Sequence, residues 1–154
     1  MMCGICGIAF AQRDAVLDPE TIRRMTGTIK HRGSDDEGFY VKPGVQMGVR
    51  RLSIVGLKTG NQPISSEDGS ITLVCNGEIY NFIELREQLE GKASLPVEVR
   101  CRSHCSSVRG VRRGCLDWLR GMFAFALWDE KKRQLTGAAI FKKCRGRRIG
   151  RYQR

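Results

Sequence analysis

The stretch RGMFAFALWDEKK, residues 120–132, decides the fold class of this chain. Its centre, residues 123–128, is an unbroken apolar run, which predicts a buried strand, and residues 129–132 predict the turn that follows it. A second apolar run at residues 71–75 is rich in β-branched side chains and predicts another buried strand. The hydrophobic core therefore includes a sheet.

The N-terminal segment predicts one strand and one helix. Residues 3–10 are a short apolar run that indicates a buried strand. Asp18 and Pro19 indicate a helix start, with Asp18 as the N-cap and Pro19 in the first turn. Apolar residues at helical spacing continue the helix to an end near Lys30. These residues are Ile22, Met25 and Ile29.

Short strands follow, and turn residues separate them. Pro43-Gly44 and Arg50-Arg51 are the expected breaks, and Asn76-Gly77 is a favourable turn dipeptide. The three predicted strands span residues 39–41, 45–49 and 52–55.

Two further helices are indicated by apolar residues that recur every three or four positions. The first contains Phe82, Leu85 and Leu89 and ends at Gly91. The second contains Leu116, Leu119 and Met122. Strands and helices in this order predict an α+β fold.

Length and charge restrict the classes of protein. A chain of 154 residues fits one domain with a hydrophobic core. Residues 1–91 carry 10 Lys and Arg against 12 Asp and Glu, whereas residues 92–154 carry 17 against 4, so the net charge of +11 belongs to the second part. The basic residues concentrate in 92–114 and 137–154. A small basic protein that binds nucleic acid through its C-terminal tail is therefore one candidate class.

The cysteines predict free thiols. No basic region followed by an apolar stretch marks a secretory signal, and no apolar run reaches the roughly 18 residues of a membrane helix. We therefore expect a cytoplasmic protein whose seven cysteines are reduced. Cys101 and Cys105 with His104, or Cys3 with Cys6, lack a partner pair at zinc-ligand spacing, so no metal site is predicted.

Five segments together resemble the class II glutamine amidotransferase domain of asparagine synthetases. The resemblance covers residues 2–91 and 115–135, and we assign the domain to residues 2–136. Enzymes that amidate other acids are similar in this part, so the acceptor of the amide stays open. The segments are MCGI at 2–5, HRGSDDEG at 31–38, RLSIV at 51–55, NGEIYN at 76–81 and RGMFAFALWD at 120–129.

The resemblance implies an N-terminal nucleophile hydrolase with four αββα layers, in which two antiparallel sheets stack and helices cover them. It also implies a reaction that hydrolyses glutamine to glutamate and ammonia through a thioester on Cys3. The α-amino group of Cys3 would be the general base, and Asn76 and Gly77 would stabilise the oxyanion. Arg51 would bind the glutamine α-carboxylate. The rest of the substrate-binding pocket would be Ile54, Val55 and Glu78.

Simpler interpretations stand beside these roles. Cys3 would be a small buried apolar residue, Arg51 a surface charge, and Asn76-Gly77 only a turn. His31 is expected to fix its loop rather than to catalyse. Cys6 and Cys75 are predicted to be core thiols.

The N-terminus departs from the family pattern, because Met1 and Met2 precede Cys3. A methionine is normally removed only before a small residue, so a chain starting at Met1 would lack a free amine on Cys3. Our hypothesis is that translation starts at Met2.

Residues 92–114 also depart from it, since the family carries a serine-aspartate motif there whose aspartate binds the glutamine amino group. Codons for residues 95–114, when translated one base later, can spell FRSKSDAEVIVHLYEEYGVD, which contains the motif. We infer that 92–114 is out of frame, with Arg100 where the aspartate belongs.

The basic tail 137–154 shows no period and matches neither the family's second hairpin strand nor its synthetase domain. The sequence therefore predicts a non-functional or glutaminase-only fragment. The glutaminase step needs no cofactor. ATP and magnesium belong to the synthetase domain, which activates aspartate and would be a partner of this one, and a homodimer stays open.

Overall fold

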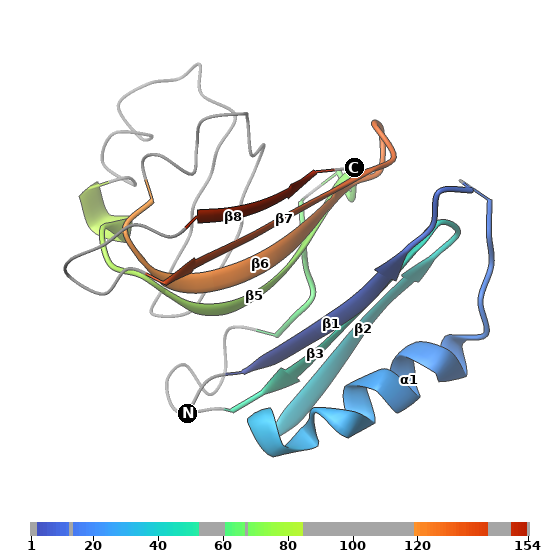
Figure 1. Ribbon diagram of the computed structural model, residues 1–154, viewed down its shortest axis with the longest axis horizontal. Helices are drawn as coiled ribbons and strands as arrows, with labels where there is room; N and C mark the ends of the chain where they lie inside the picture. The colour runs from blue at the N-terminus through green and yellow to red at the C-terminus, as the bar shows by residue number, and fades with distance from the viewer. Residues whose placement is uncertain are drawn as a thin grey trace.

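The computed structural model describes residues 3–12, 14–52, 61–66, 68–84, 119–141 and 149–153. Within them, two antiparallel sheets pack against each other and one long helix lies against the outer side of the smaller sheet (Figure 1). The smaller sheet has the strand order β1-β3-β2, and the larger has the order β4-β5-β6-β7-β8. The architecture fits the predicted α+β class.

The elements have the following bounds. The helices are α1 (Pro19–Thr28) and the 3-10 turn η1 (Lys30–Arg32). The strands of the smaller sheet are β1 (Gly4–Ala9), β2 (Asp36–Lys42) and β3 (Val45–Arg51). Those of the larger sheet are β4 (Ile64–Ser65), β5 (Ile71–Ile79), β6 (Gly121–Asp129), β7 (Gln134–Phe141) and β8 (Ile149–Gln153).

The helix α1 begins as its sequence predicts. The Asp18 carboxylate accepts a hydrogen bond from the Glu20 N–H at 2.9 Å, and Pro19 is the first helical residue. Ile22 and Thr26 are fully buried against the sheet. Gly48 of β3 leaves the space that Thr26 fills, because a Cβ there would overlap the threonine hydroxyl. The Thr26 side chain of the helix therefore packs into the space that Gly48 leaves on the sheet.

A shared core joins the two sheets. Val45, Met47 and Val49 alternate along the inner face of β3, and they pack with Val74 of β5 and Trp128 of β6. Each of these side chains is at most 4% exposed. The sheets are therefore parts of one packed unit.

The other face of the larger sheet has its own apolar cluster. Its members are at most 7% exposed, and the rings of Phe123 and Phe125 stack with 6.1 Å between centroids. The predictions of residues 123–128 as core and of Cys75 as a core thiol are confirmed. The cluster contains Leu73, Cys75, Phe123, Phe125 and Leu127.

Three local predictions are wrong. Arg50-Arg51 does not interrupt a strand, because β3 runs through it and Arg51 pairs with Asp36. Asn76-Gly77 is not a turn, because β5 continues to Ile79 and pairs with β6 throughout. Met122 lies in β6 rather than in a helix. In all three cases, pairing with a neighbouring strand overrides the local preference.

The tail contains strand structure where its sequence shows no period. The strand β7 pairs with β6 as far as Phe141, and β8 pairs with β7. Antiparallel pairing uses backbone groups, so a segment that includes Gly137 can join the sheet edge without an alternating pattern.

Several sequence predictions lie outside the described residues. They concern the inferred out-of-frame segment 92–114 with Arg100, the strand continuing through residues 53–55, and most of the two predicted helices around residues 85–91 and 116–118. Residues 82–84 are helical, as the first of these helices requires.

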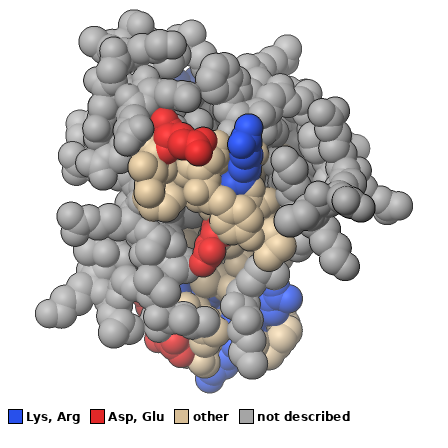
Figure 2. All heavy atoms as spheres, turned by 90° about the vertical axis from the view of Figure 1, so that its left-hand side faces the viewer, with Lys and Arg blue, Asp and Glu red and all other residues tan. Residues whose placement is uncertain are grey.

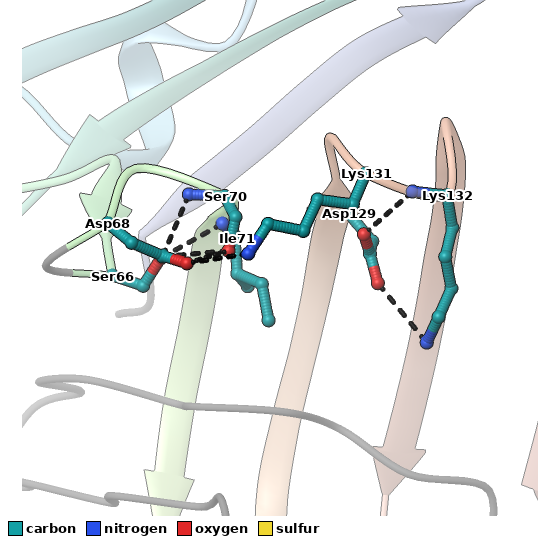
Figure 3. A network of polar contacts seen from close by, with 7 residues as sticks. All are labelled: Ser66, Asp68, Ser70, Ile71, Asp129, Lys131 and Lys132. Atoms are coloured by element: carbon teal, nitrogen blue, oxygen red, sulfur yellow. Dashed lines mark hydrogen bonds and ion pairs between the residues drawn. The ribbon is translucent and has the colours of Figure 1, made fainter.

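Polar contacts tie the turns at one end of the larger sheet. Asp68, in the turn before β5, accepts hydrogen bonds from the hydroxyls of Ser66 and Ser70 and pairs with Lys131 at 3.0 Å (Figure 3). Lys132 pairs with Asp129 at 3.3 Å in the turn after β6. The turns before β5 and after β6 are therefore held side by side. Among the described helices, none has the length and apolar character needed to cross a membrane.

Candidate functional site

Cys3 lies directly before β1 and is half-buried. Gly4 pairs with Arg50, so the antiparallel register sets Cys3 opposite Arg51. Because side chains alternate along a strand, Cys3 lies on the same face of the sheet as Ile5, and Arg51 on the same face as Val49. Ile5 and Val49 both pack in the core between the sheets. The thiol and the guanidinium therefore belong to the inner face of the smaller sheet.

Arg51 is buried, with 6% of the residue exposed. Its carbonyl oxygen accepts a hydrogen bond from the Asp35 N–H at 3.1 Å. Gly33 lies so close that a Cβ would come within 2.6 Å of the Arg51 backbone. The loop at residues 31–38 thus packs on the end of β3, and the interpretation of Arg51 as a surface charge is wrong.

The same loop is fixed to the helix and to β3 by Arg50. The Arg50 guanidinium pairs with Glu37 at 2.6 Å and donates to the Thr26 carbonyl at 3.3 Å. His31, which was expected to fix the loop, is exposed in η1.

Asn76 and Gly77 lie near the end of β5. Asn76 lies on the same face of β5 as Val74, and Val74 packs between the sheets. Its Oδ1 atom is buried and has no hydrogen-bond partner among the residues that the structure describes. Gly77 has φ +110°, and a Cβ there would overlap the Met122 carbonyl oxygen. Only glycine fits this position without strain.

These residues gather at one end of the structure. The strand β1 begins, and β3 and β5 end, on the left side of Figure 1. Both β1 and β3 contact β5 across the interface between the sheets. Cys3, Arg51 and Asn76 therefore belong to the same end and to faces that look toward one another.

The described surface at this end carries charges of both signs. Figure 2 looks onto it, and its acidic and basic side chains stand apart among uncharged atoms. Glu78, expected in the pocket, is exposed on β5. Ile54 and Val55 lie outside the described residues.

The resolved pKa shifts concern the opposite end of the sheets. The Trp128 indole N–H, with Arg133 and Tyr40, lowers the pKa of Glu130. Burial raises the pKa of Tyr40. Hydrogen bonds from Ser66 and Ser70, with Lys131, lower the pKa of Asp68. These groups hold turns and strands together away from Cys3.

Within the same described residues, no three His, Cys, Asp or Glu side chains gather as a metal site would need. In that part of the chain, the thiols of Cys3, Cys6 and Cys75 form no disulfide. The Cys6 thiol lies 3.3 Å from the Thr26 hydroxyl, under the helix. His104 and its neighbouring cysteines lie outside the described ranges.

Sequence reasoning missed Gln62. Its side-chain amide makes two hydrogen bonds with the backbone of Cys75, the residue before Asn76. No spacing rule identifies such a residue, because the two positions are 13 apart in the chain.

Known proteins are similar to this chain over most of its length. The family described as "Glutamine amidotransferase domain" matches residues 2–139. Asparagine synthetase [glutamine-hydrolyzing] 1 of Bacillus subtilis is 37% identical over 140 residues, which are 89% of this chain and 22% of that protein. Asparagine synthetase B [glutamine-hydrolyzing] of Escherichia coli is 33% identical over 131 residues, which are 85% of this chain and 24% of that protein. Asparagine synthetase [glutamine-hydrolyzing] 1 of Saccharomyces cerevisiae is 36% identical over 141 residues, again 24% of its length. The chain thus spans about a quarter or less of these relatives.

Proposed function

The chain belongs to the glutamine amidotransferase domain family, and from that membership we propose that it hydrolyses the side-chain amide of glutamine to glutamate and ammonia. The observation that carries the proposal is that Cys3, Arg51 and Asn76 occupy strand ends at the same end of two packed sheets, on faces that pack toward each other. A thiol can attack the amide of a substrate, a side-chain amide can stabilise the intermediate, and a buried guanidinium can bind a carboxylate of the same substrate.

Cys3 is the proposed nucleophile. Its thiol gives a proton to its own α-amino group, and the sulfur attacks the amide carbon of glutamine. The tetrahedral intermediate collapses when the C–N bond breaks and the proton passes to the leaving nitrogen, which departs as ammonia. Water then hydrolyses the thioester, which releases glutamate and restores the thiol. This chemistry requires Cys3 to be the first residue of the mature chain, so we propose Met2 as the start and its removal.

The Asn76 side chain and the Gly77 N–H are the proposed oxyanion donors. The position of Asn76 supports this role, because it shares the face of Val74 that packs toward the smaller sheet, and an oxyanion would accept a hydrogen bond from its Nδ2. Loss of one such donor typically lowers the rate by about 10²–10³-fold.

Arg51 is proposed to bind the α-carboxylate of glutamine, with Ile54, Val55 and Glu78 lining the rest of the pocket. Its burial supports this role, because a guanidinium in a low-dielectric site binds a carboxylate more strongly than one in water.

The proposal extends to the fold, for which we infer the four-layer αββα arrangement of N-terminal nucleophile hydrolases. Two packed antiparallel sheets with α1 outside one of them are compatible with it. We also infer that residues 2–136 form the domain and that residues 92–114 are translated out of frame.

For the whole protein, we propose that the ammonia serves the synthesis of asparagine. The relatives are named glutamine-hydrolysing asparagine synthetases. In this proposal a synthetase domain activates aspartate with ATP and magnesium, and the glutaminase step uses no cofactor.

Covalent labelling tests the proposal. A chain whose intact mass shows Cys3 at the N-terminus should release ammonia from glutamine and gain one adduct from a diazo-ketone analogue of glutamine. Cys3→Ala should abolish both, whereas Cys6→Ala is the matched control and should keep both. No ammonia and no adduct from the correctly processed chain would contradict the proposal. A salt-dependent shift with DNA alongside an inert Cys3 would favour the nucleic-acid class instead.

A further inference from the structure

The edge of β5 next to Asn76 is held by a side chain instead of a strand. The strand β4 pairs with β5 at only two positions, Ile64 with Leu73 and Ser65 with Thr72. Continuing that register would set Pro63 and Gln62 opposite Val74 and Cys75, but Pro63 has no backbone N–H to donate.

Gln62 supplies the missing hydrogen bonds through its side chain. Its Oε1 accepts from the Cys75 N–H at 2.6 Å, and its Nε2 donates to the Cys75 carbonyl at 2.9 Å. A primary amide offers the same donor and acceptor as a peptide group, so it completes this position of the sheet. Both backbone polar groups of Cys75 are thus satisfied by one side chain.

This contact fixes the strand immediately before the candidate oxyanion donors. The Cys75 side chain is buried in the apolar cluster with Phe123 and Phe125. Contacts at the sheet edge and on one face of the sheet therefore fix this residue. Asn76 follows it, and Gly77 follows Asn76. The orientation of the Asn76 side chain and of the Gly77 N–H therefore depends on the Cys75 peptide group, to which Gln62 is hydrogen-bonded.

The backbone of Gln62 also touches the smaller sheet. Its carbonyl oxygen occupies the space where a Cβ at Gly38 of β2 would lie. Gln62 therefore lies between β2 and β5, and it relates the end of β5 to the sheet that carries Cys3 and Arg51.

We propose that Gln62 is a positioning residue that sets the oxyanion donors Asn76 and Gly77 relative to Cys3. The inference rests on the proposed glutaminase function. Because these donors act on the charge that develops in the transition state, a displacement of about 1 Å lowers turnover by about 10²-fold and changes ground-state binding little.

Kinetics of three variants of the full chain test the proposal. Gln62→Ala should lower kcat by about 10–10²-fold while KM for glutamine changes less than about 3-fold. Gln62→Glu keeps the acceptor for the Cys75 N–H and loses the donor to the Cys75 carbonyl, so it should fall between Ala and the wild type. Ser65→Ala is the matched control, since it removes a 3.1 Å contact with Thr72 on the same strand pair, away from Asn76.

A double mutant tests whether the effect passes through Asn76. In an Asn76→Ala background, Gln62→Ala should lower kcat by a clearly smaller factor than in the wild type, because one of the two donors that it positions is gone. Equal losses in both backgrounds, or a change in KM alone, would overturn the proposal.

Amide hydrogen exchange separates failure of this inference from failure of the proposed function. Gln62→Ala should speed exchange at the Cys75 N–H, whereas Gln62→Glu, which keeps the acceptor, should speed it less, and Ser65→Ala should not change it. Unchanged exchange at Cys75 in Gln62→Ala overturns the positioning role whatever the activity. A wild-type chain with Cys3 at its N-terminus that releases no ammonia would overturn the glutaminase proposal, and the positioning role with it.

Discussion

At the scale of single residues, the candidate site consists of groups that are costly to bury. Arg51 is 6% exposed, the buried Asn76 Oδ1 has no partner within the described part of the chain, and Gly77 holds a backbone conformation that other residues avoid. Such costs are tolerated where a ligand compensates for them. Substitutions at these positions should therefore separate binding from stability.

Arg51→Lys should raise KM for glutamine by about 10-fold or more and leave kcat within about 3-fold, since lysine cannot bind a carboxylate through two parallel hydrogen bonds. Steady-state ammonia release measures both constants. Arg23→Lys on the exposed face of α1 is the control, because its ion pair with Glu20 is 4.0 Å long and solvent-exposed. An unchanged KM in Arg51→Lys would remove Arg51 from the substrate-binding group.

Gly77→Ala should lower the free energy of unfolding by about 1–3 kcal/mol, because a Cβ overlaps the Met122 carbonyl and the backbone has φ +110°. Gly69→Ala is matched to it. Gly69 also has a positive φ, +65°, but a Cβ there meets nothing within 4 Å, so its cost should be smaller. Urea unfolding compares the two, and equal losses would contradict the steric argument.

The sequence could name the candidate site residues but not the contacts that hold them. Cys3, Arg51 and Asn76 could be named because a family motif carries each of them. Gln62 and the pair of Arg50 with Glu37 could not, because each contact joins residues that only the fold brings together. The breaks expected at Arg50-Arg51 and Asn76-Gly77 were wrong for the same reason, since a paired neighbour extends a strand through residues of low strand preference.

At the scale of elements, the two sheets are linked by one carboxylate away from Cys3. Glu130, in the turn after β6, accepts from the Trp128 indole at 2.6 Å and from the Tyr40 hydroxyl of β2 at 3.2 Å. Arg133 bonds the same carboxylate at 2.8 Å and the Pro43 carbonyl at 2.7 Å. The turns at this end therefore close the structure on the side opposite the candidate site.

Glu130→Ala should cost about 1 kcal/mol, because it leaves the buried Trp128 N–H without its acceptor while water reaches the partly exposed carboxylate position. The folded state lowers the pKa of Glu130, so this stabilisation is present above the unfolded value and is lost as the pH falls through the folded one. The difference from the wild type in urea unfolding should therefore shrink below about pH 4. A constant difference from pH 7 to pH 3 would contradict the ionic contribution.

At the scale of the whole molecule, the core between the sheets decides whether they fold as one unit. Met47 is 1% exposed at its centre, with neighbours from both sheets. Short apolar and β-branched runs predicted the strands on either side of this core, and the N-cap of α1 with its helical spacing predicted the helix. The face-to-face contact itself came only from family resemblance, because an apolar run indicates burial but not what covers it.

Met47→Ala should destabilise the protein by about 2–5 kcal/mol, since it leaves a cavity between the sheets. Met122→Ala is the matched control, because Met122 is 39% exposed and should change stability by less than about 0.5 kcal/mol. Thermal unfolding followed by circular dichroism compares them. Similar melting temperatures for the two variants would contradict the contribution of Met47 to a core shared by the two sheets.

The position of Trp128 between the sheets makes it an intrinsic fluorescent probe. The indole is 4% exposed between the two sheets, and the Arg133 guanidinium lies 5.4 Å from its ring centroid. Any event that parts the sheets brings solvent to this ring, so its emission moves to longer wavelength and becomes open to quenching by iodide. Separation of the layers can thus be followed in solution without attaching a dye.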